Sequence, residues 1–328
     1  MNQTRVPGTV SVVVGLVAVV ILAFLAWQGV ERWLARRALA AHLEHGKAYA
    51  ARRFEELGLL PDELGESSGL ATSRIQPGVL WSHNDSGDGP NLYAIDLSGR
   101  LLAIVPVSGA TALDWEDIAS GSCPTGMPAS SCLYVADTGD NTRVRSELTV
   151  YIVVEPLLDG TGAGPPTLEA RSFRYRYPDE PHDTEALVVL PDGDVTVVSK
   201  GRTGTIDFFV FPAAGIADAL ASGAVLVARH RGNTGIAPDA RIGRLVTGAA
   251  VTPDGRMLAV RTYTEVFFFE AAGINSADGR SWRDLGRPCF LGDTEPQGEA
   301  IEHLDADTWL LTSERAMGRP GAIYRVQC

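Results

Sequence analysis

The chain has 328 residues, 45% of them hydrophobic, which is enough to bury a sizeable core in one large or two modest domains and argues against intrinsic disorder. Its formal net charge of −12, together with the lack of any Lys/Arg-rich run, argues against a nucleic-acid partner. Glycine is abundant, with 35 residues, and helical periodicity is scarce after residue 62, so many short strands joined by turns are expected.

The amino-terminal segment differs from the rest of the chain. No charged residue lies between Arg5 and Glu31, and the stretch "TVSVVVGLVAVVILAFLAW" is nearly continuously apolar. A bilayer is spanned by about 20 apolar residues. The segment ends without a small-x-small cleavage site, and Trp27 stands where an interfacial anchor would lie. Residues 1–30 are therefore predicted to be an uncleaved signal anchor and transmembrane helix, with a cleaved signal peptide as the alternative.

The side of the membrane that the body occupies is indicated by two conflicting signals. Only Arg5 precedes the apolar segment, whereas four basic residues follow it: Arg32, Arg36, Arg37 and Lys47. Alone, this asymmetry favours a cytoplasmic body. Four cysteines favour the opposite side, because an even set in loops is typical of an oxidising compartment, although free buried thiols are an alternative. Cys123 and Cys132 flank one loop and Cys289 could reach Cys328, but three pairings are open. We expect an extracytoplasmic body.

The segment after the anchor is rich in Ala, Leu, Arg and Glu as far as Leu60, which predicts a helical stalk over residues 31–62. Pro61 ends this pattern. Residues 63–328 are expected to form the main domain.

The main domain repeats one pattern five times. Each repeat opens with a short apolar strand and continues with two further strands; the openings are "SGLATS" from Ser68, "EDIASG" from Glu116, "EALVVL" from Glu185, "GAAVTP" from Gly248 and "EAIEHL" from Glu299. A fourth, looser strand follows in the first four repeats. Modules of this size predict an all-β fold, a β-propeller of five four-stranded blades, with two β-sandwiches as the alternative. A sixth blade could lie within 156–182 or 212–245, and the missing strand of the last blade could come from residues near 60–67.

The repeat predicts which residues meet at one end of the central channel. In an antiparallel blade the start of the first strand and the end of the second lie at the same end. This places several carboxylates there, with Asp114 and Asp183 just before two of the openings. The stretches "HNDSGDG" and "VADTGDN" occupy the same loop in consecutive blades, and their Asp and Gly residues also suit tight turns. Hard oxygen ligands in such number are typical of a Ca²⁺ site. The candidate metal ligands are Asn84, Asp85, Asp137, Asp140, Asn141, Glu116, Glu185 and Glu299.

Cations and aromatic residues in the same region suggest how a substrate is held. Lys200 and Arg261 could bind an anionic group or form ion pairs between blades. Tyr263 and Trp115 are further candidates for contact with a substrate. The candidate general bases are Glu116, Glu185, Glu299 and His83. No nucleophilic serine elbow or phosphate-binding loop is present in the sequence.

Several stretches resemble a group of uncharacterised bacterial propeller proteins: "ESSGLATS", "VLWSHNDSG", "DWEDIA", "LYVADTGDN", "DTEAL" and "QGEAIEH". Over residues 63–328 the chain is also loosely similar to β-propeller phytases and to the SdiA-regulated and calcium-dependent phosphotriesterase-like propellers. The resemblance implies an exported propeller with acidic strand openings near a calcium-binding channel. Ser68 and Gly248 stand where the other blades carry glutamate, and the full phytase ligand set is not matched, which places phytase activity itself in doubt.

These observations together predict a membrane-anchored propeller whose acidic funnel binds a divalent cation, calcium being the first choice. Such a site could hydrolyse a phosphoester or a lactone-like substrate, with an anionic small molecule as ligand. The alternative is a non-catalytic propeller that binds a ligand or a partner protein.

Overall fold

A computed structural model describes residues 8–159, 167–272 and 281–328, with side chains from Val20 onward except at 271, 272 and 281. The chain divides into two compact units, residues 1–45 and 46–328. Helix α1 spans Gly8–Gly46 and is the main element of the first unit. Within the described part of the chain, no helix is both long and apolar enough to cross a membrane. The predicted anchor, residues 1–30, lies partly outside the described residues.

The predicted helical stalk ends earlier than expected. Helix α1 stops at Gly46, a single 3-10 turn η1 covers Lys47–Tyr49, and residues Arg53–Leu59 form strand β1. The prediction of a helix as far as residue 62 is therefore wrong for this segment. Its Glu and Leu residues favour a helix in isolation, but pairing with the carboxy-terminal strand overrides that weak preference. The ring of Phe54, for example, packs 5.2 Å from the ring of Tyr324.

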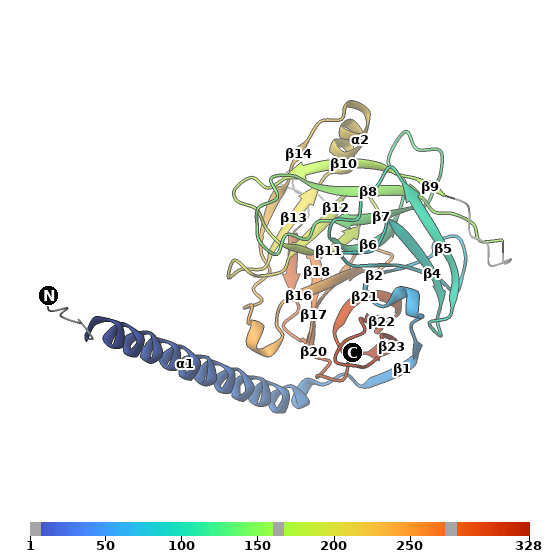
Figure 1. Cartoon of the computed structure of the whole chain (residues 1–328). Helices are drawn as coiled ribbons and strands as arrows, with labels where there is room; N and C mark the ends of the chain where they lie inside the picture. The colour runs from blue at the N-terminus through green and yellow to red at the C-terminus, as the bar shows by residue number, and fades with distance from the viewer. Residues whose placement is uncertain (1–7, 160–166, 273–280) are drawn as a thin grey trace, which may run out of the picture. The chain divides into compact units, whose positions relative to one another are not determined.

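Five antiparallel sheets form the second unit, and they are the five predicted blades (Figure 1). The first two blades are built from β2 (Ser67–Thr72), β3 (Val79–Asn84), β4 (Asn91–Asp96) and β5 (Leu101–Ser108), and from β6 (Trp115–Gly121), β7 (Cys132–Asp137), β8 (Leu148–Val154) and β10 (Arg171–Arg176). The third is built from β11 (Thr184–Val189), β12 (Val195–Ser199), β13 (Asp207–Phe211) and β15 (Arg229–Asn233).

The fourth blade contains β16 (Val246–Val251), β17 (Met257–Thr262), β18 (Glu265–Ala272) and β19 (Ser281–Asp284), with β20 (Cys289–Phe290) also paired to β18. The fifth contains β21 (Gly298–Asp305), β22 (Thr308–Ser313) and β23 (Ala322–Gln327). Strand β1, which comes from the start of the unit's sequence, completes this blade by pairing with β23. The strand that closes the ring thus precedes the predicted segment 60–67.

No sixth blade is found among the described residues. In the first candidate region the two-residue strand β9 (Leu168–Glu169) joins the first blade, and strand β10 belongs to the second blade. In the second candidate region helix α2 (Ala213–Ser222) and the pair β14 (Leu226–Val227) lie beside β10, and β15 joins the third blade. These long connections therefore decorate existing blades.

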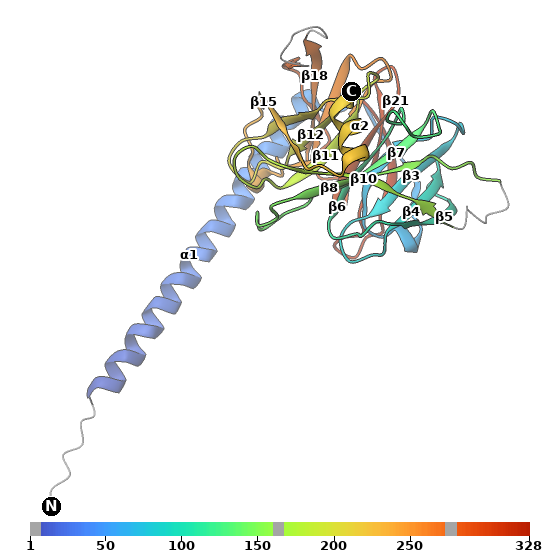
Figure 2. The same cartoon turned by 90° about the horizontal axis from the view of Figure 1, so that it is seen from above.

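Packing between blades holds the ring together. Each of five hydrophobic clusters is shared by two neighbouring blades, and the large side chains Trp81, Trp115 and Trp309 are almost fully buried in them. The first strands of the blades are β2, β6, β11, β16 and β21; they contact one another in ring order and so surround the central channel. Figure 2 labels β6, β11 and β21 among them. The disulfide Cys123–Cys132 closes the β6–β7 connection. The disulfide Cys289–Cys328 links the fourth blade to the fifth.

Candidate functional site

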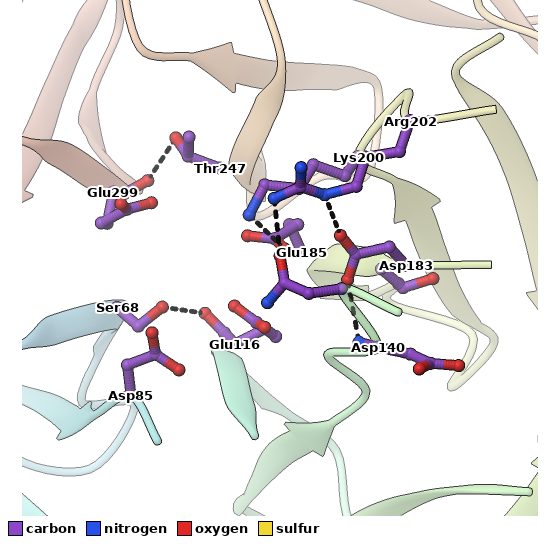
Figure 3. A network of polar contacts seen from close by, with 12 residues as sticks. Ser68, Asp85, Glu116, Asp140, Asp183, Glu185, Lys200, Arg202, Thr247 and Glu299 are labelled. Carbon is purple, nitrogen blue, oxygen red and sulfur yellow. Dashed lines mark hydrogen bonds and ion pairs between the residues drawn. The ribbon is translucent and has the colours of Figure 1, made fainter. Parts of the chain in front are cut away.

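Each inner strand carries a β-bulge near its start, and the bulged residue faces the channel. The register shifts lie between Ser67 and Gly69, Trp115 and Asp117, Thr184 and Ala186, Val246 and Gly248, and Gly298 and Ile301. A bulge leaves one residue outside the ladder and re-aims its side chain. The repeat thus produces a ring of five positions, here called the bulge ring: Ser68, Glu116, Glu185, Thr247 and Glu299 (Figure 3).

The bulge ring corrects the alignment of the fourth blade. The position equivalent to the glutamates is Thr247, not Gly248. Thr247 Oγ1 donates to the backbone carbonyl of Glu299 at 2.9 Å, and Ser68 Oγ donates in the same way to Glu116 at 2.8 Å. Gly248 is needed for close packing, because a Cβ there would lie 2.9 Å from the carbonyl oxygen of Glu299. The two blades without a glutamate therefore use hydroxyl side chains to fix the backbone of the glutamates beside them.

Two groups of three carboxylates converge at the funnel, the end of the channel where the inner strands begin. The first trio is Asp85, Asp114 and Glu116, and the second is Glu116, Asp183 and Glu185. Within each trio one oxygen per residue lies within 4.8 Å of the others. Because Ca²⁺ binds oxygens at about 2.3–2.6 Å, two ligands of one ion lie at most roughly 5 Å apart. The described carboxylates therefore fit a metal ion, and the donor set is made of hard oxygens only.

Two of the three carboxylates in the second trio are paired with cations of the chain itself. Lys200 Nζ lies 2.5 Å from Glu185 Oε1, and both side chains are buried. Arg202 Nε donates to Asp183 Oδ2 at 2.7 Å, while the backbone N–H of Asp140 donates to the other oxygen, Oδ1, at 2.8 Å. Figure 3 shows these cations approaching from the third blade. Glu185 and Asp183 thus have their countercharges in place, whereas Glu116, which belongs to both trios, is in neither ion pair.

The first trio has no such partner. Within the described ranges, no Lys or Arg forms an ion pair with Asp85, Asp114 or Glu116. Burial, followed by the charges of Asp85 and Asp183, raises the pKa of Asp114 to about 6. Burial, followed by the charge of Glu185, raises the pKa of Glu116 well above its usual value. A cation placed among these carboxylates would reverse both effects, because it favours their ionised form.

The opposite side of the funnel carries a second pair of acidic groups. Gln297 Nε2 donates to Glu299 Oε1 at 2.9 Å and to Glu314 Oε2 at 2.7 Å. Burial and the charge of Asp85 raise the pKa of Glu314 to about 8, and burial together with the charge of Glu314 raises that of Glu299 well above its usual range. Burial also raises the pKa of the Tyr263 hydroxyl, with further contributions from Glu299 and Glu185, which indicates that this ring lies near the same groups. Glu314 thus provides a protonated carboxyl group here at neutral pH.

Several predicted metal ligands instead shape the loops. Asp137 pairs with Arg145 at 2.8 Å. Asp140 accepts backbone N–H bonds from Val144 and Arg145. Asn141 accepts a bond from Arg202. In the loop of the first blade, the matching roles fall on Asn84 and Asp88, which are bonded to each other and to Tyr93. Of the two Asp-x-Gly-Asp loops, only Asp85 therefore contributes to a carboxylate trio.

Three predicted site residues lie in the packed structure and not in the funnel. Arg261 is fully buried in an ion pair with Glu295 and donates to the carbonyl of Thr312 at 3.1 Å. Trp115 is 1% exposed and donates its ring N–H to the carbonyl of Thr111. His83 is also buried, its Nδ1 bonded to its neighbour's carbonyl, and burial lowers its pKa to about 4. The structure thus offers these three side chains no route to a substrate in the funnel.

Sequence reasoning gave too little weight to the position two residues before the bulge ring. Asp114 and Asp183 occupy it in the second and third blades, and Gln297 occupies it in the fifth. The signal was present as "DWE", "DTE" and "QGE". Arg202 lay beyond any repeated motif and was missed.

No family model matches the chain, and no curated protein matches it. Among solved structures it is similar to the PQQ-bound aldose sugar dehydrogenase of Streptomyces coelicolor, with 12% identity, 84% of this chain and 98% of that chain covered, and a TM-score of 0.49. A putative phosphatase from Bacteroides thetaiotaomicron shows 11% identity, coverage of 84% and 78%, and a TM-score of 0.49. A putative gluconolactonase shows 14% identity, with 80% of this chain and 73% of that chain covered, and a TM-score of 0.39. Likenesses this distant say nothing about activity; the propeller assignment rests on the chain's own strand order.

Proposed function

We propose that the protein is a membrane-anchored, extracytoplasmic propeller that binds one calcium ion in the funnel and hydrolyses a phosphoester or lactone-like substrate there. One observation carries the proposal. Asp85, Asp114 and Glu116 bring oxygens within 4.8 Å of one another and none of them forms an ion pair with a described Lys or Arg, whereas the other two carboxylates of the adjacent trio are paired with Lys200 and Arg202. Three buried or half-buried carboxylates that face each other are costly unless a cation joins them.

Calcium is the ion that the donor chemistry favours. All donors are carboxylate oxygens, and no histidine or cysteine of the described residues belongs to either trio. Ca²⁺ takes six to eight oxygen ligands in adaptable geometry, whereas Mg²⁺ requires near-ideal octahedral geometry. Three carboxylates leave room for water and for a substrate oxygen.

A divalent cation at this site would polarise a substrate oxygen and lower the pKa of a bound water. The chain's own residues supply the other functions. The Lys200 ammonium, which is paired with Glu185, would also attract the anionic group of the substrate. Burial raises the pKa of Glu314 to about 8, so Glu314 retains a proton at neutral pH and could protonate a leaving group; burial raises the pKa of Glu299 in the same direction. Gln297 would orient both carboxyl groups, because its one amide group donates to an oxygen of each.

Calorimetric titration of CaCl₂ into the full chain in detergent micelles tests the metal site. The wild type is expected to bind one ion, and Asp85→Asn/Asp114→Asn is expected to abolish binding. Glu314→Gln is the matched control, because it removes a funnel carboxylate outside both trios. An unchanged isotherm in the double variant would reject the site, and absence of binding in the wild type would reject the metal-dependent hydrolase.

Turnover of p-nitrophenyl phosphate, p-nitrophenyl phosphodiesters and simple lactones, with and without calcium, tests the reaction. Calcium-dependent turnover that falls in Glu299→Gln/Glu314→Gln, with calcium binding retained, supports hydrolysis.

A non-catalytic binding propeller is the second candidate. Three large apolar side chains are strongly exposed on loops at the funnel end, Leu113 at 63%, Val144 at 74% and Met317 at 82%. Contact with a partner or with an apolar part of a ligand would remove these side chains from water. Calcium binding without turnover of any of these substrates would favour this candidate.

The location rests on separate observations. Both disulfides fit an oxidising compartment, since such bonds are rare in the cytosol. The apolar run at the amino terminus supports the anchor. Protease treatment of intact cells that removes residues 46–328 while the chain stays with the membrane fraction would be the expected result; protection until the cells are lysed would contradict it.

A further inference from the structure

A second cavity opens at the end of the channel opposite the funnel. Its volume is about 190 Å³. The last residues of the inner strands line it, among them Gly121 of β6, Val189 of β11 and Val251 of β16. Because the inner strands begin at the funnel, these positions are at the far mouth of the channel. The cavity therefore shares none of the funnel residues.

A buried carboxylate separates this cavity from the funnel. Asp117 Oδ1 accepts the N–H of Ile118 at 2.9 Å, and Oδ2 accepts the N–H of Leu187 at 2.8 Å and of Ala249 at 3.5 Å. These amides belong to the inner strands of the second, third and fourth blades. The first blade closes in as well, because a Cβ on Gly69 would lie 2.5 Å from the backbone nitrogen of Ile118. Asp117 thus forms a floor across the channel.

The cavity carries an acidic group at its inner end. Glu302, on the inner strand of the fifth blade, lines it and accepts a bond from Thr72 Oγ1 at 2.8 Å. Burial raises the pKa of Glu302 to about 7. No lysine or arginine of the described residues forms an ion pair with it. A cation from outside the chain would favour the ionised form of this carboxyl group.

A basic group lies at the rim of the same cavity. Arg74, on the β2–β3 connection, is exposed and lines the cavity, and its guanidinium makes one long contact of 3.4 Å with Ser122 Oγ. A guanidinium carries five N–H donors and is suited to a carboxylate. The rest of the lining is mixed, with Val188 and Pro253 on the apolar side and Ser120 and Thr252 on the polar side.

We propose that this cavity binds a small zwitterion of the ω-amino acid type, with its ammonium group on Glu302 and its carboxylate on Arg74. A simple anion would be repelled by Glu302, and a simple cation would leave Arg74 without a partner. The charges are expected at the two ends of the ligand because Glu302 is half-buried on inner strand β21, whereas Arg74 is exposed on the β2–β3 connection. A cavity of roughly 150 Å³ holds a molecule the size of benzene, so the 190 Å³ here suits a ligand of about seven or eight heavy atoms.

Calorimetry of the full chain with γ-aminobutyrate tests the proposal, with butylamine and butyrate as comparators that each lack one charge. γ-Aminobutyrate is expected to bind about tenfold or more tightly than either comparator, because each lost charged hydrogen bond costs at least that factor. Glu302→Gln and Arg74→Gln should each weaken binding by a similar factor. Arg100→Gln, an exposed arginine outside the cavity, should leave it unchanged.

The opposite results would overturn the proposal. These are no binding of γ-aminobutyrate, equal binding of butylamine, or unchanged binding in Arg74→Gln. If Glu302→Gln fails to fold, Arg74→Gln still decides, because that side chain is exposed. Asp85→Asn/Asp114→Asn, which removes the proposed calcium site, should not affect γ-aminobutyrate binding, so the two proposals can fail separately.

Discussion

Replacement of Lys200 by methionine tests whether this side chain serves as a built-in cation. The ammonium of Lys200 and the carboxylate of Glu185 have side-chain exposures of 9% and 2%. Removal of one partner of a buried pair costs about 3–5 kcal/mol, because the other charge remains buried. At roughly 2–4 °C per kcal/mol, the melting temperature of Lys200→Met without calcium should fall by roughly 6–20 °C.

The measurement is thermal unfolding at pH 8 without calcium, followed by calorimetric titration with CaCl₂. At pH 8 Glu185, whose pKa burial raises to about 7, is still largely ionised in the wild type. Without Lys200 the second trio loses its main countercharge, so a second calcium ion should bind and recover about 2.7 kcal/mol of stability when free calcium is 100 times the Kd. Lys200→Arg, which keeps the charge, is the matched control and should bind one ion.

Two results would refute this reasoning. An unchanged melting temperature for Lys200→Met would mean that Lys200 does not stabilise the ionised Glu185. A stoichiometry that stays at one would mean that the second trio cannot accept a metal even when it is free.

Three further predictions concern the rest of the propeller. Burial raises the folded pKa of Glu302 from 4.5 to about 7, so this residue destabilises the fold progressively as the pH rises through that window. The free energy of unfolding of Glu302→Gln, measured by urea titration, should rise relative to the wild type by up to about 3 kcal/mol between pH 4.5 and 8. A difference that does not depend on pH would contradict this prediction. Loss of the Cys289–Cys328 bond, which spans 39 positions, should lower the free energy of unfolding by about 4 kcal/mol, against about 2.5 kcal/mol for Cys123–Cys132, which spans 9. The measurement is denaturant unfolding of two variants, in each of which both cysteines of one bond are replaced by serine. Equal losses in the two variants would mean that chain entropy is not the cause. A fragment of residues 46–328 should unfold cooperatively, whereas residues 60–328, which lack β1, should melt earlier and self-associate through the uncovered edge of β23; equal melting temperatures would refute the closing role of β1.

The sequence predicts the propeller well because each inner strand restarts with the same short apolar pattern after a similar interval. It could not locate the bulges, since a one-residue bulge leaves no trace in composition. Thr247 and Gly248 therefore exchanged roles in the prediction. The strand β1 was missed because "RFEELGL" has helix-forming residues, and only its distant partner β23 makes it a strand.

The funnel was predicted less completely than the fold. Glu116, Glu185 and Asp85 were expected there because of their places in the repeat, and they are brought together. Arg261 and Lys200 end equivalent strands, yet only Lys200 reaches the funnel. Gly298 leaves an open space over which the Arg261 guanidinium lies, since a Cβ at Gly298 would collide with it. Packing of this kind between side chains from different blades cannot be predicted from the spacing of motifs along the sequence.

The closure of the ring has a consequence for how the protein is made. Arg52, next to β1, donates to the carbonyl of Cys328 at 2.9 Å, across 276 positions of the chain. During synthesis the segment of β1 emerges long before β23 exists, and it must wait as an unpaired edge while four blades form behind it. Contacts of such long range slow folding and prolong the exposure of unpaired strands to other chains. The fifth blade can thus be completed only after β23 has been synthesised, and the Cys289–Cys328 bond can secure it only after that moment.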